Sequence, residues 1–402
     1  MRVLLTTRGS TGHVGPLAEF GHAARRAGHD VLVAAQPQHA VNVERTGLPF
    51  APLADPPPEA WMPLLGEFGV LDFDTAHERM VGEFFAGIDT EAALAPLAAL
   101  VDDWRPDVVL RESWEFASTL VAAPRGIPLV RVGLGLTSLE EQTIRLAAPA
   151  LEPERARLGL PPDPAGDRMR AAPCLTTVPE PFDDAGGTEP GAIHRFMHPR
   201  SAAQAPPLPA DWWAPGDRRP LVYVSFGSVT AGAHLPFYPS LYRAAIQALG
   251  GMEARILLTV GEERDHGELG PLPPNVRVER WVGQDEVLPR VAATVTHGGY
   301  GSTLGALSHG VPLVVLPLFS GDQFANATAV ARAGAGVALG ADGARRGALD
   351  LPSTATVAGL RPAVERTLAD PAYRQRASRI SRAMRKLPPV DAAVDLLEDL
   401  AR

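Results

Sequence analysis

The chain has 402 residues, of which 46% are hydrophobic, and its formal net charge is −9. This length and apolar content are enough for two or three domains with cores of ordinary size. The acidic balance argues against a nucleic-acid-binding protein, which normally presents a basic face, so no nucleic-acid partner is expected. The single cysteine, Cys174, excludes an internal disulfide and a cysteine-based metal cluster.

The first residues give no sign of export. The apolar run at the N-terminus reaches polar residues too early for a signal peptide. No run approaches the roughly 20 apolar residues that a membrane-spanning helix needs. We therefore expect a cytoplasmic protein without a membrane partner, and a homodimer is compatible with the sequence.

The N-terminal segment predicts a strand, a glycine-containing turn, a helix and a second strand. The strands are residues 2–7 and 30–35, and apolar residues at helical spacing lie between them. The spacing of Gly9, Gly12 and Gly15 differs from the G-x-G-x-x-G of dinucleotide-binding proteins, and no acidic residue follows the second strand to bind a ribose. A nicotinamide cofactor is therefore not expected.

His13 follows the first strand and would lie at the carboxyl edge of the sheet. A neutral imidazole there can accept a proton from a hydroxyl group, and such a base usually needs an orienting carboxylate. The predicted strand 106–110 is flanked by Asp107 at its start and Glu112 at its end, and only Glu112 shares an edge with His13. The alternatives are a helix-capping role for His13 and a substrate-contacting or solvent-contacting role for Glu112.

Residues 51–90 are rich in proline and predict a long irregular region, of a kind that often forms a binding loop. Its apolar side chains can line a pocket for an apolar acceptor, or they can belong to the core of a helical excursion. The candidates for acceptor binding are Trp61, Phe68, Phe84 and, after strand 106–110, Trp114. Asp72-Phe73-Asp74 matches a D-x-D metal motif, but it lies far along the chain from any phosphate-binding turn.

Strands and helices alternate in both halves of the chain, and a segment dense in proline and small residues separates the halves. This pattern predicts an N-terminal Rossmann-like domain (1–200), a linker (201–219), a second Rossmann-like domain (220–385) and a C-terminal helix (386–402). Further strands are expected at 127–132, 175–178, 193–197, 221–225, 254–260, 276–279, 291–296 and 311–316.

Residues 291–316 read as strand, glycine turn, helix and strand, which places the turn at the carboxyl edge of a parallel sheet, where such sheets bind ligands. Glycines let the backbone approach a ligand, and the helix start offers N–H groups to an anion. Around this turn, Trp281 can stack on a nucleobase, His297 can bond a phosphate, and Asp322-Gln323 can hold hydroxyl groups. A phosphate-bearing ligand is the resulting expectation.

Four motifs follow one another in this region: RWVGQ, THGGYGS, GVPLVVLP and GDQFANA. Together they resemble the donor-binding signature of the UDP-glycosyltransferase superfamily, in particular its bacterial natural-product (antibiotic) glycosyltransferases of GT-B fold. The resemblance implies an α/β fold in which two Rossmann-like domains face a cleft and the last helix crosses back to the N-terminal domain. It also implies a sugar nucleotide and an apolar aglycone as partners, with no metal and no other cofactor.

The resemblance also assigns roles to individual residues. His13, in the motif Gly12-His13-Val14-Gly15-Pro16, takes the place of the general base. Glu112 stands where related enzymes often have aspartate. The residues that match donor-binding positions are Ser228, Trp281, Val282, Gln284, His297, Gly298, Gly299, Gly301, Ser302, Asp322 and Gln323, with weaker matches at Gly12, Ser225 and Gly227.

One position departs from the pattern of this family. Many relatives have a glutamate eight residues after the motif histidine, which bonds the ribose hydroxyls, whereas this chain has Gly305. A site without a partner for the 2′-hydroxyl does not penalise a deoxyribose. This departure favours a dTDP-linked sugar, especially a deoxysugar, over a UDP-linked sugar.

The sequence therefore predicts an inverting glycosyltransferase of the hexosyltransferase type. A nucleotide-sugar epimerase or hydrolase of the same fold is an alternative, and a non-catalytic nucleotide-sugar-binding helper protein is another. The presence of both His13 and Asp322-Gln323 argues against the helper protein.

Overall fold

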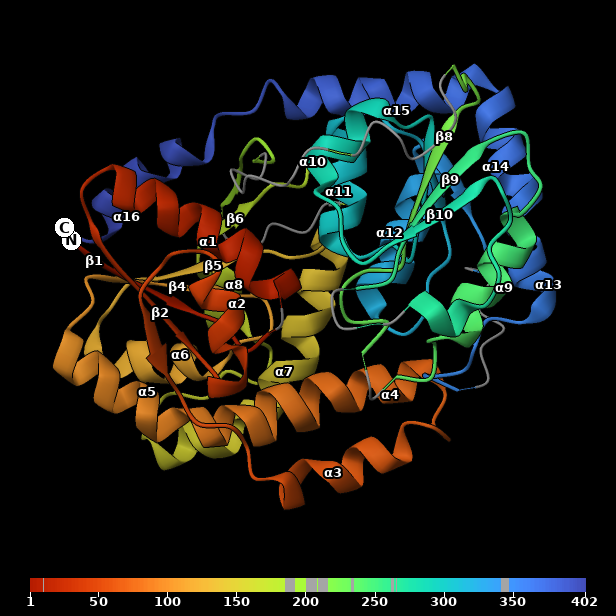
Figure 1. The fold of residues 1–402 in the computed structure, drawn as a ribbon. Coiled ribbons are helices and arrows are strands. Elements are labelled where there is room, and N and C mark those ends of the chain that lie inside the picture. The colour runs from red at the N-terminus through yellow and green to blue at the C-terminus, as the bar shows by residue number, and fades with distance from the viewer. Residues whose placement is uncertain are drawn as a thin grey trace. The chain divides into compact units, whose positions relative to one another are not determined.

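The structure is a computed structural model, and it describes residues 1–9, 11–184, 192–199, 208, 216–232, 235–261, 264, 266–340 and 347–402. The chain forms two compact units (Figure 1). Unit 1 consists of Met1–Pro199 and Leu387–Arg402, and unit 2 consists of Arg200–Lys386. The expected linker 201–219 lies mostly outside the described residues.

Unit 1 contains a seven-stranded parallel sheet with the order β3-β2-β1-β4-β5-β6-β7. The strand order changes direction between β1 and β4, so the carboxyl ends of these two strands flank a topological switch point, where open α/β sheets bind ligands. The strands are β1 (Arg2–Thr6), β2 (Asp30–Ala35), β3 (Phe50–Pro52), β4 (Val108–Glu112), β5 (Leu129–Val132), β6 (Cys174–Thr176) and β7 (Ile193–Arg195).

Helices cover both faces of this sheet, because successive side chains of a strand point to opposite faces. Val3 and Leu5 of β1 pack with α1 and α16, whereas Leu4 packs with α5, α6 and α7. These helices are α1 (Thr11–Arg26), α5 (Thr90–Trp104), α6 (Ala117–Ala122), α7 (Thr137–Arg157) and α16 (Ala393–Leu400). Two surface ion pairs, Arg26–Asp391 and His29–Glu398, also join the C-terminal segment to α1 and the turn after it.

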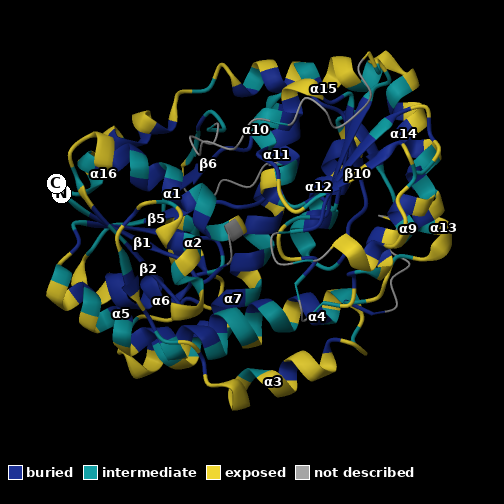
Figure 2. Cartoon of the chain, viewed as in Figure 1, coloured by how far each residue is buried: buried dark blue, intermediate teal, exposed yellow. Residues whose placement is uncertain are grey.

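The proline-rich region 51–90 is largely helical, so the expectation of an irregular region is wrong. It contains α3 (Pro58–Glu67), α4 (Phe73–Arg79) and a π-helix (Met80–Asp89) that continues into α5. Prolines at the start of α3 are compatible with a helix, because the N–H groups of the first turn have no intrahelical partner. Figure 2 shows α3 as mostly exposed, whereas the strands of both sheets are buried.

The continuous helical stretch Phe73–Trp104 is, by length and composition alone, long and apolar enough to cross a membrane. The sequence-based expectation that no segment reaches this limit was therefore too strict. Val81, Ala86, Leu94 and Leu97 of this stretch belong to the core beneath the sheet. Packing in unit 1 thus accounts for part of its apolar character, since 39% of the most apolar window is buried.

Unit 2 contains a six-stranded parallel sheet with the order β10-β9-β8-β11-β12-β13, and its switch point lies between β8 and β11. The strands are β8 (Leu221–Ser225), β9 (Arg255–Thr259), β10 (Val276–Glu279), β11 (Ala293–Thr296), β12 (Leu313–Val315) and β13 (Gly336–Ala338). The longer helices of this unit and the short α10 are α9 (Ser240–Leu249), α10 (Gln284–Val287), α11 (Tyr300–Ser308), α12 (Gly321–Arg332), α14 (Leu360–Ala369) and α15 (Pro371–Met384).

Two edge strands, β3 and β13, were not predicted. Each has only three residues, and β13 begins with Gly336. β3 follows Pro49 and ends with Pro52, and β13 lies between Gly334 and Gly340, so neither shows the apolar run that made the equally short β12 recognisable.

Candidate active site

At the switch point of unit 1, His13 and Glu112 lie side by side. His13 is in the first turn of α1, and Glu112 is the last residue of β4. Nδ1 of His13 lies 3.2 Å from Oε2 of Glu112, with the Glu112 side chain fully buried and that of His13 27% exposed. Asp107 is at the opposite end of β4, where it accepts a hydrogen bond from the N–H of Arg2.

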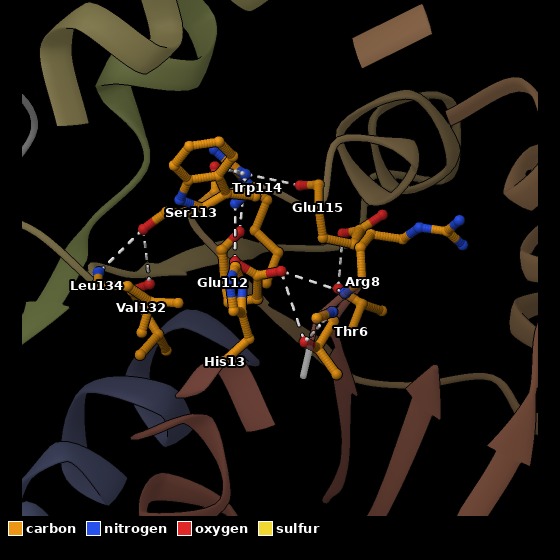
Figure 3. Close-up of polar contacts among 12 residues, drawn as sticks. Thr6, Arg8, His13, Glu112, Ser113, Trp114, Glu115, Val132 and Leu134 are labelled. Carbon is orange, nitrogen blue, oxygen red and sulfur yellow. Dashed lines mark hydrogen bonds and ion pairs between the residues drawn. The ribbon is translucent and has the colours of Figure 1, made fainter. Parts of the chain in front are cut away.

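The Glu112 carboxylate is held by several donors (Figure 3). Oε2 accepts the N–H of Trp114 at 2.8 Å, and Oε1 accepts the N–H of Arg8 at 3.1 Å. Burial alone would raise the pKa of this carboxyl, but His13 and the two backbone N–H groups outweigh burial and hold the pKa below its ordinary value. Glu112 is therefore an ionised partner for His13 at neutral pH.

Gly9 creates the space that the His13 ring occupies. A Cβ atom at residue 9 would lie 2.0 Å from Cγ of His13, much closer than any van der Waals contact. At Gly12 and Gly15 a Cβ atom would meet nothing within 4 Å. The glycine at position 9 is thus required by the position of the imidazole, and those at 12 and 15 are not.

A series of aromatic ring contacts connects His13 with the helices of region 51–90. The rings of His13 and Trp114 are 6.3 Å apart, and those of Trp114 and Phe85 are 4.9 Å apart, both with edge-to-face geometry. Phe85 contacts Phe84 in the same way, at 5.0 Å. Trp114, a predicted acceptor-binding residue, therefore lies between the imidazole and Phe85.

A cavity of about 330 Å³ lies in unit 1 beside α3 and the π-helix. Three of the four predicted acceptor-binding residues, Trp61, Phe68 and Phe84, line it, and Trp114 does not. Region 51–90 is therefore helical and its apolar side chains also line a cavity, and binding of an acceptor there stays a prediction. The complete lining is Gln38, Asp55, Pro56, Pro58, Trp61, Leu64, Leu65, Phe68, Met80 and Phe84.

A buried polar chain beside the cavity was not predicted. The guanidinium of Arg8 binds the carboxylate of Asp89, the last residue of the π-helix, and both side chains are almost fully buried. Burial lowers the pKa of Arg8 to about 10, so it remains charged at neutral pH. Arg8 directly follows β1 and could have been found from its place on the carboxyl edge, but nothing local in the sequence singles out Asp89.

In unit 2 the imidazole of His297 lies between two glycines at the switch point of the sheet. A Cβ atom at Gly227, after β8, would lie 2.7 Å from Nε2 of His297, and one at Gly299 would lie 2.6 Å from it. Burial lowers the pKa of His297 to about 4, although a hydrogen bond with the backbone of Ser225 acts in the opposite direction. His297 is therefore neutral at neutral pH.

The turn after His297 is shaped by glycine and held by α12. Gly298 has a φ of +92°, and a Cβ atom there would lie 2.7 Å from the carbonyl oxygen of Gln323. Asn326 donates a hydrogen bond of 2.8 Å to the carbonyl of Gly298. Gly299, the N-cap of α11, has no side chain with which to cap the helix, so the turn leaves the helix start accessible to an anion.

The other predicted donor residues of unit 2 lie on the loop after β10, on α10 and on α11 and α12. Trp281 is 51% exposed on the loop after β10, whereas the neighbouring Val282 is buried. Gln284, the first residue of α10, lies over Gly305, where a Cβ atom would be 2.8 Å from its Oε1. Nε2 of Gln284 is 3.5 Å from the hydroxyl of Ser302, next to the exposed Gly301.

Asp322 and Gln323 lie in the first turn of α12, and they differ in burial and in hydrogen bonding. Asp322 is half-buried in the first turn of the helix. Gln323 is buried, and its Oε1 accepts the N–H groups of Leu318 and Phe319 at 2.8 and 3.1 Å. The oxygen of Gln323 thus holds the loop after β12, and its amide nitrogen is the group left for a ligand.

The donor candidate Ser228, the weaker candidates Gly12 and Ser225, and the D-x-D motif have plain structural settings. Oγ of Ser225 accepts the N–H of Gly227 at 3.4 Å, Ser228 is exposed, and Gly12 is exposed at the start of α1. Asp72 caps α4 by accepting the N–H of Thr75 at 3.0 Å. Within the described ranges, no group of three or more His, Cys, Asp or Glu side chains is placed to hold a metal ion.

The depressed pKa of His297 predicts a pH-dependent stability. An unfolded chain takes up a proton at this histidine below pH 6.5, whereas the folded chain does so only near pH 4. The contribution of His297 to the free energy of unfolding is therefore complete above pH 6.5 and falls as the pH decreases toward 4. We expect the wild type to lose about 2 kcal/mol more than His297→Gln between pH 7 and pH 5 in urea unfolding. Parallel profiles for the two proteins would contradict this assignment.

Known proteins resemble this chain over most of its length. The N-terminal and C-terminal domain models of the erythromycin biosynthesis protein CIII-like family match residues 22–171 and 243–400. The chain is 33% identical to L-demethylnoviosyl transferase of Streptomyces niveus over 84% of this chain and 85% of that one. It is 31% identical to 4'-demethylrebeccamycin synthase of Lentzea aerocolonigenes over 99% of both.

Among solved structures, the chain is similar to the glycosyltransferase SsfS6 of Streptomyces sp. SF2575, complexed with thymidine diphosphate, with a TM-score of 0.74 and 25% identity over 99% of both chains. The same two parallel α/β units are thus found in an enzyme that transfers sugars. The chain therefore belongs to the erythromycin biosynthesis protein CIII-like family, and it is a bacterial natural-product glycosyltransferase of GT-B fold.

Proposed function

We propose that this glycosyltransferase moves a sugar, with inversion, from a dTDP- or UDP-sugar to a hydroxyl group of an apolar aglycone, with His13 as the general base and without a metal ion. The observation that carries the proposal is the 3.2 Å contact between Nδ1 of His13 and the buried Glu112 carboxylate. A carboxylate that faces one nitrogen of an imidazole orients the ring and stabilises its protonated form.

The proton transfer follows from this geometry. With the Glu112 carboxylate 3.2 Å from Nδ1 of His13, the tautomer that carries its proton on Nδ1 is favoured, and Nε2 then presents its lone pair to the acceptor hydroxyl. As the hydroxyl oxygen attacks the anomeric carbon, its proton passes to Nε2 and the bond from that carbon to the nucleotide diphosphate breaks. The attack from the face opposite to the leaving group inverts the anomeric configuration.

The departing diphosphate gains negative charge, and the turn after β11 is suited to stabilise it. The start of α11 and the turn at Gly298 and Gly299 offer backbone N–H groups, and Ser302 offers a hydroxyl. Trp281, half-exposed after β10, is placed to stack on the base. The thymidine diphosphate bound by SsfS6 supports a nucleotide diphosphate as the ligand of this unit.

The acceptor side of the proposal rests on unit 1. The cavity lined by Trp61, Phe68 and Phe84 is mostly apolar, as a site for an aglycone should be. Trp114 and Phe85 connect its wall with His13 by ring contacts. The related L-demethylnoviosyl transferase and 4'-demethylrebeccamycin synthase are consistent with transfer to a natural product.

His13→Ala tests the base. We expect turnover to fall by roughly 100-fold or more, which is the usual contribution of a general base, whereas affinity for thymidine diphosphate stays within about twofold. Nucleotide diphosphate release should be measured with and without an aglycone, since release that needs no acceptor indicates a hydrolase. The matched control is His22→Ala, further along α1, and turnover of His13→Ala at the wild-type rate would remove His13 from the mechanism.

Gly9→Ala tests the position of the imidazole while leaving residue 13 a histidine. The new methyl group overlaps the ring of His13, so we expect kcat to fall by about tenfold or more while donor affinity is retained. Gly15→Ala is the control, because a Cβ atom there meets nothing within 4 Å. Equal rates for the two variants would show that the ring does not need its present position.

The preference for the sugar of the nucleotide depends on position 305. UDP and deoxy-UDP differ only in the 2′-hydroxyl, and the wild type should bind them within about twofold of each other, because Gly305 offers no partner. Gly305→Glu adds a carboxylate and should favour UDP by roughly fivefold, with Gly305→Ala as the control for the added Cβ atom beside Gln284. Titration calorimetry measures both affinities, and a strong wild-type preference for UDP would contradict this role of Gly305.

A further inference from the structure

The cavity of unit 1 has a polar edge within a mostly apolar wall. Gln38 and Asp55 are its two side chains with oxygen atoms, and the remaining lining residues are proline, leucine, methionine or aromatic residues. The indole N–H of Trp61 is an uncharged donor, whereas Asp55 carries a full negative charge. The hydrogen-bonding groups and the charge at this polar edge determine which ligand the cavity can hold.

The amide of Gln38 has its orientation fixed by a chain of hydrogen bonds that starts at Asp89. The Asp89 carboxylate only accepts, so the amide nitrogen of Gln36 must face it, at 2.8 Å. The oxygen of Gln36 then faces Gln38 and accepts from Nε2 of that residue at 3.2 Å. Because the nitrogen of Gln38 is turned to Gln36, its oxygen remains as an acceptor at the edge of the cavity.

In the described part of the chain, Arg8 and His39 are the basic side chains that sense the charge of Asp55. Arg8 is close enough to feel this charge, but its guanidinium is already bound to Asp89. His39 also feels it, and burial together with the charge of His13 lowers the pKa of His39, so the ring is neutral at neutral pH. A ligand group that donates a hydrogen bond therefore meets a full negative charge at Asp55.

The aromatic part of the cavity lining is suited to flat rings. Trp61 and Phe84 lie edge-to-face with centroids 6.5 Å apart, and Phe68 and Met80 also line the cavity. Aromatic side chains and a thioether make favourable contacts with aromatic rings, in addition to the apolar area that they bury.

We infer that the cavity takes a fused aromatic compound whose edge carries a hydrogen-bond donor, a hydroxyl or an amino group, and that Asp55 and Gln38 select this donor. The inference rests on the proposed function, in which the cavity holds the acceptor. Its test nevertheless measures binding without any sugar nucleotide, so a failure of sugar transfer and a failure of this selection can be told apart.

The test uses the full chain and calorimetric titration with a dihydroxynaphthalene that has one hydroxyl on each ring. Its dimethyl ether keeps the rings and the oxygen atoms but loses both donors. We expect the diol to bind about tenfold more tightly than the ether, the effect of one hydrogen bond to a charged acceptor. An aminomethyl analogue, which is an ammonium ion at neutral pH, shows whether hydroxyl or ammonium is the better donor. Equal affinity of diol and ether, or no binding of any of the compounds, would overturn the inference.

Two variants test whether Asp55 is the residue that selects the hydrogen-bond donor of the ligand. Asp55→Asn keeps the shape of an exposed side chain but removes its charge, so the preference for the diol should fall to about twofold. Asp74→Asn is the matched control, because Asp74 is exposed in the same unit and does not line the cavity, and it should keep the tenfold preference. A full preference in Asp55→Asn, or an equal loss in both variants, would show that Asp55 does not select the donor.

Discussion

The arrangement of unit 1 depends on a buried negative charge. An isolated carboxylate in a protein interior costs several kcal/mol, and Glu112 is tolerated because donors surround it. These donors include the backbone N–H groups of Arg8 after β1 and Trp114 after β4, and the imidazole of His13 faces the same carboxylate. The parallel pairing of β1 with β4 brings these groups together, since both strands end at the same edge of the sheet. The fold thus supplies an ionised partner for a histidine.

Both units use glycine in the same way, which is to leave room for an imidazole at the switch point of a parallel sheet. In unit 1 the missing side chain of Gly9 accommodates His13, and in unit 2 those of Gly227 and Gly299 accommodate His297. The consequences for charge differ. His13 has an ionised carboxylate beside it, which favours uptake of a proton, whereas burial keeps His297 neutral. One ring is therefore suited to accept a proton and the other to bind a phosphate without changing its charge.

Several features of the site could be predicted because they follow from the order of residues along a strand and the turn after it. Glu112 could be chosen over Asp107 because the two residues lie at opposite ends of β4, and the structure places Glu112 beside His13. The turn at His297 could be located because a strand, three glycines and a helix follow one another there. Region 51–90 was harder, because its prolines suggested a loop, although Pro58 occupies the first position of α3, which tolerates proline, and Pro63 lies inside the same helix.

The sequence by itself determined the family, the two parallel sheets and the residues at their carboxyl edges, because these depend on local patterns and on spacing along the chain. Only the tertiary structure decided what those residues contact. The pairing of Arg8 with Asp89 joins positions 81 residues apart, and the bond from Asn326 to Gly298 spans 28 residues. The oxygen of Gln323, expected near the sugar, is instead taken up by the backbone of the preceding loop. Such contacts arise from the packing of loops and helices at the edge of an open sheet, and no periodicity within a single segment encodes them.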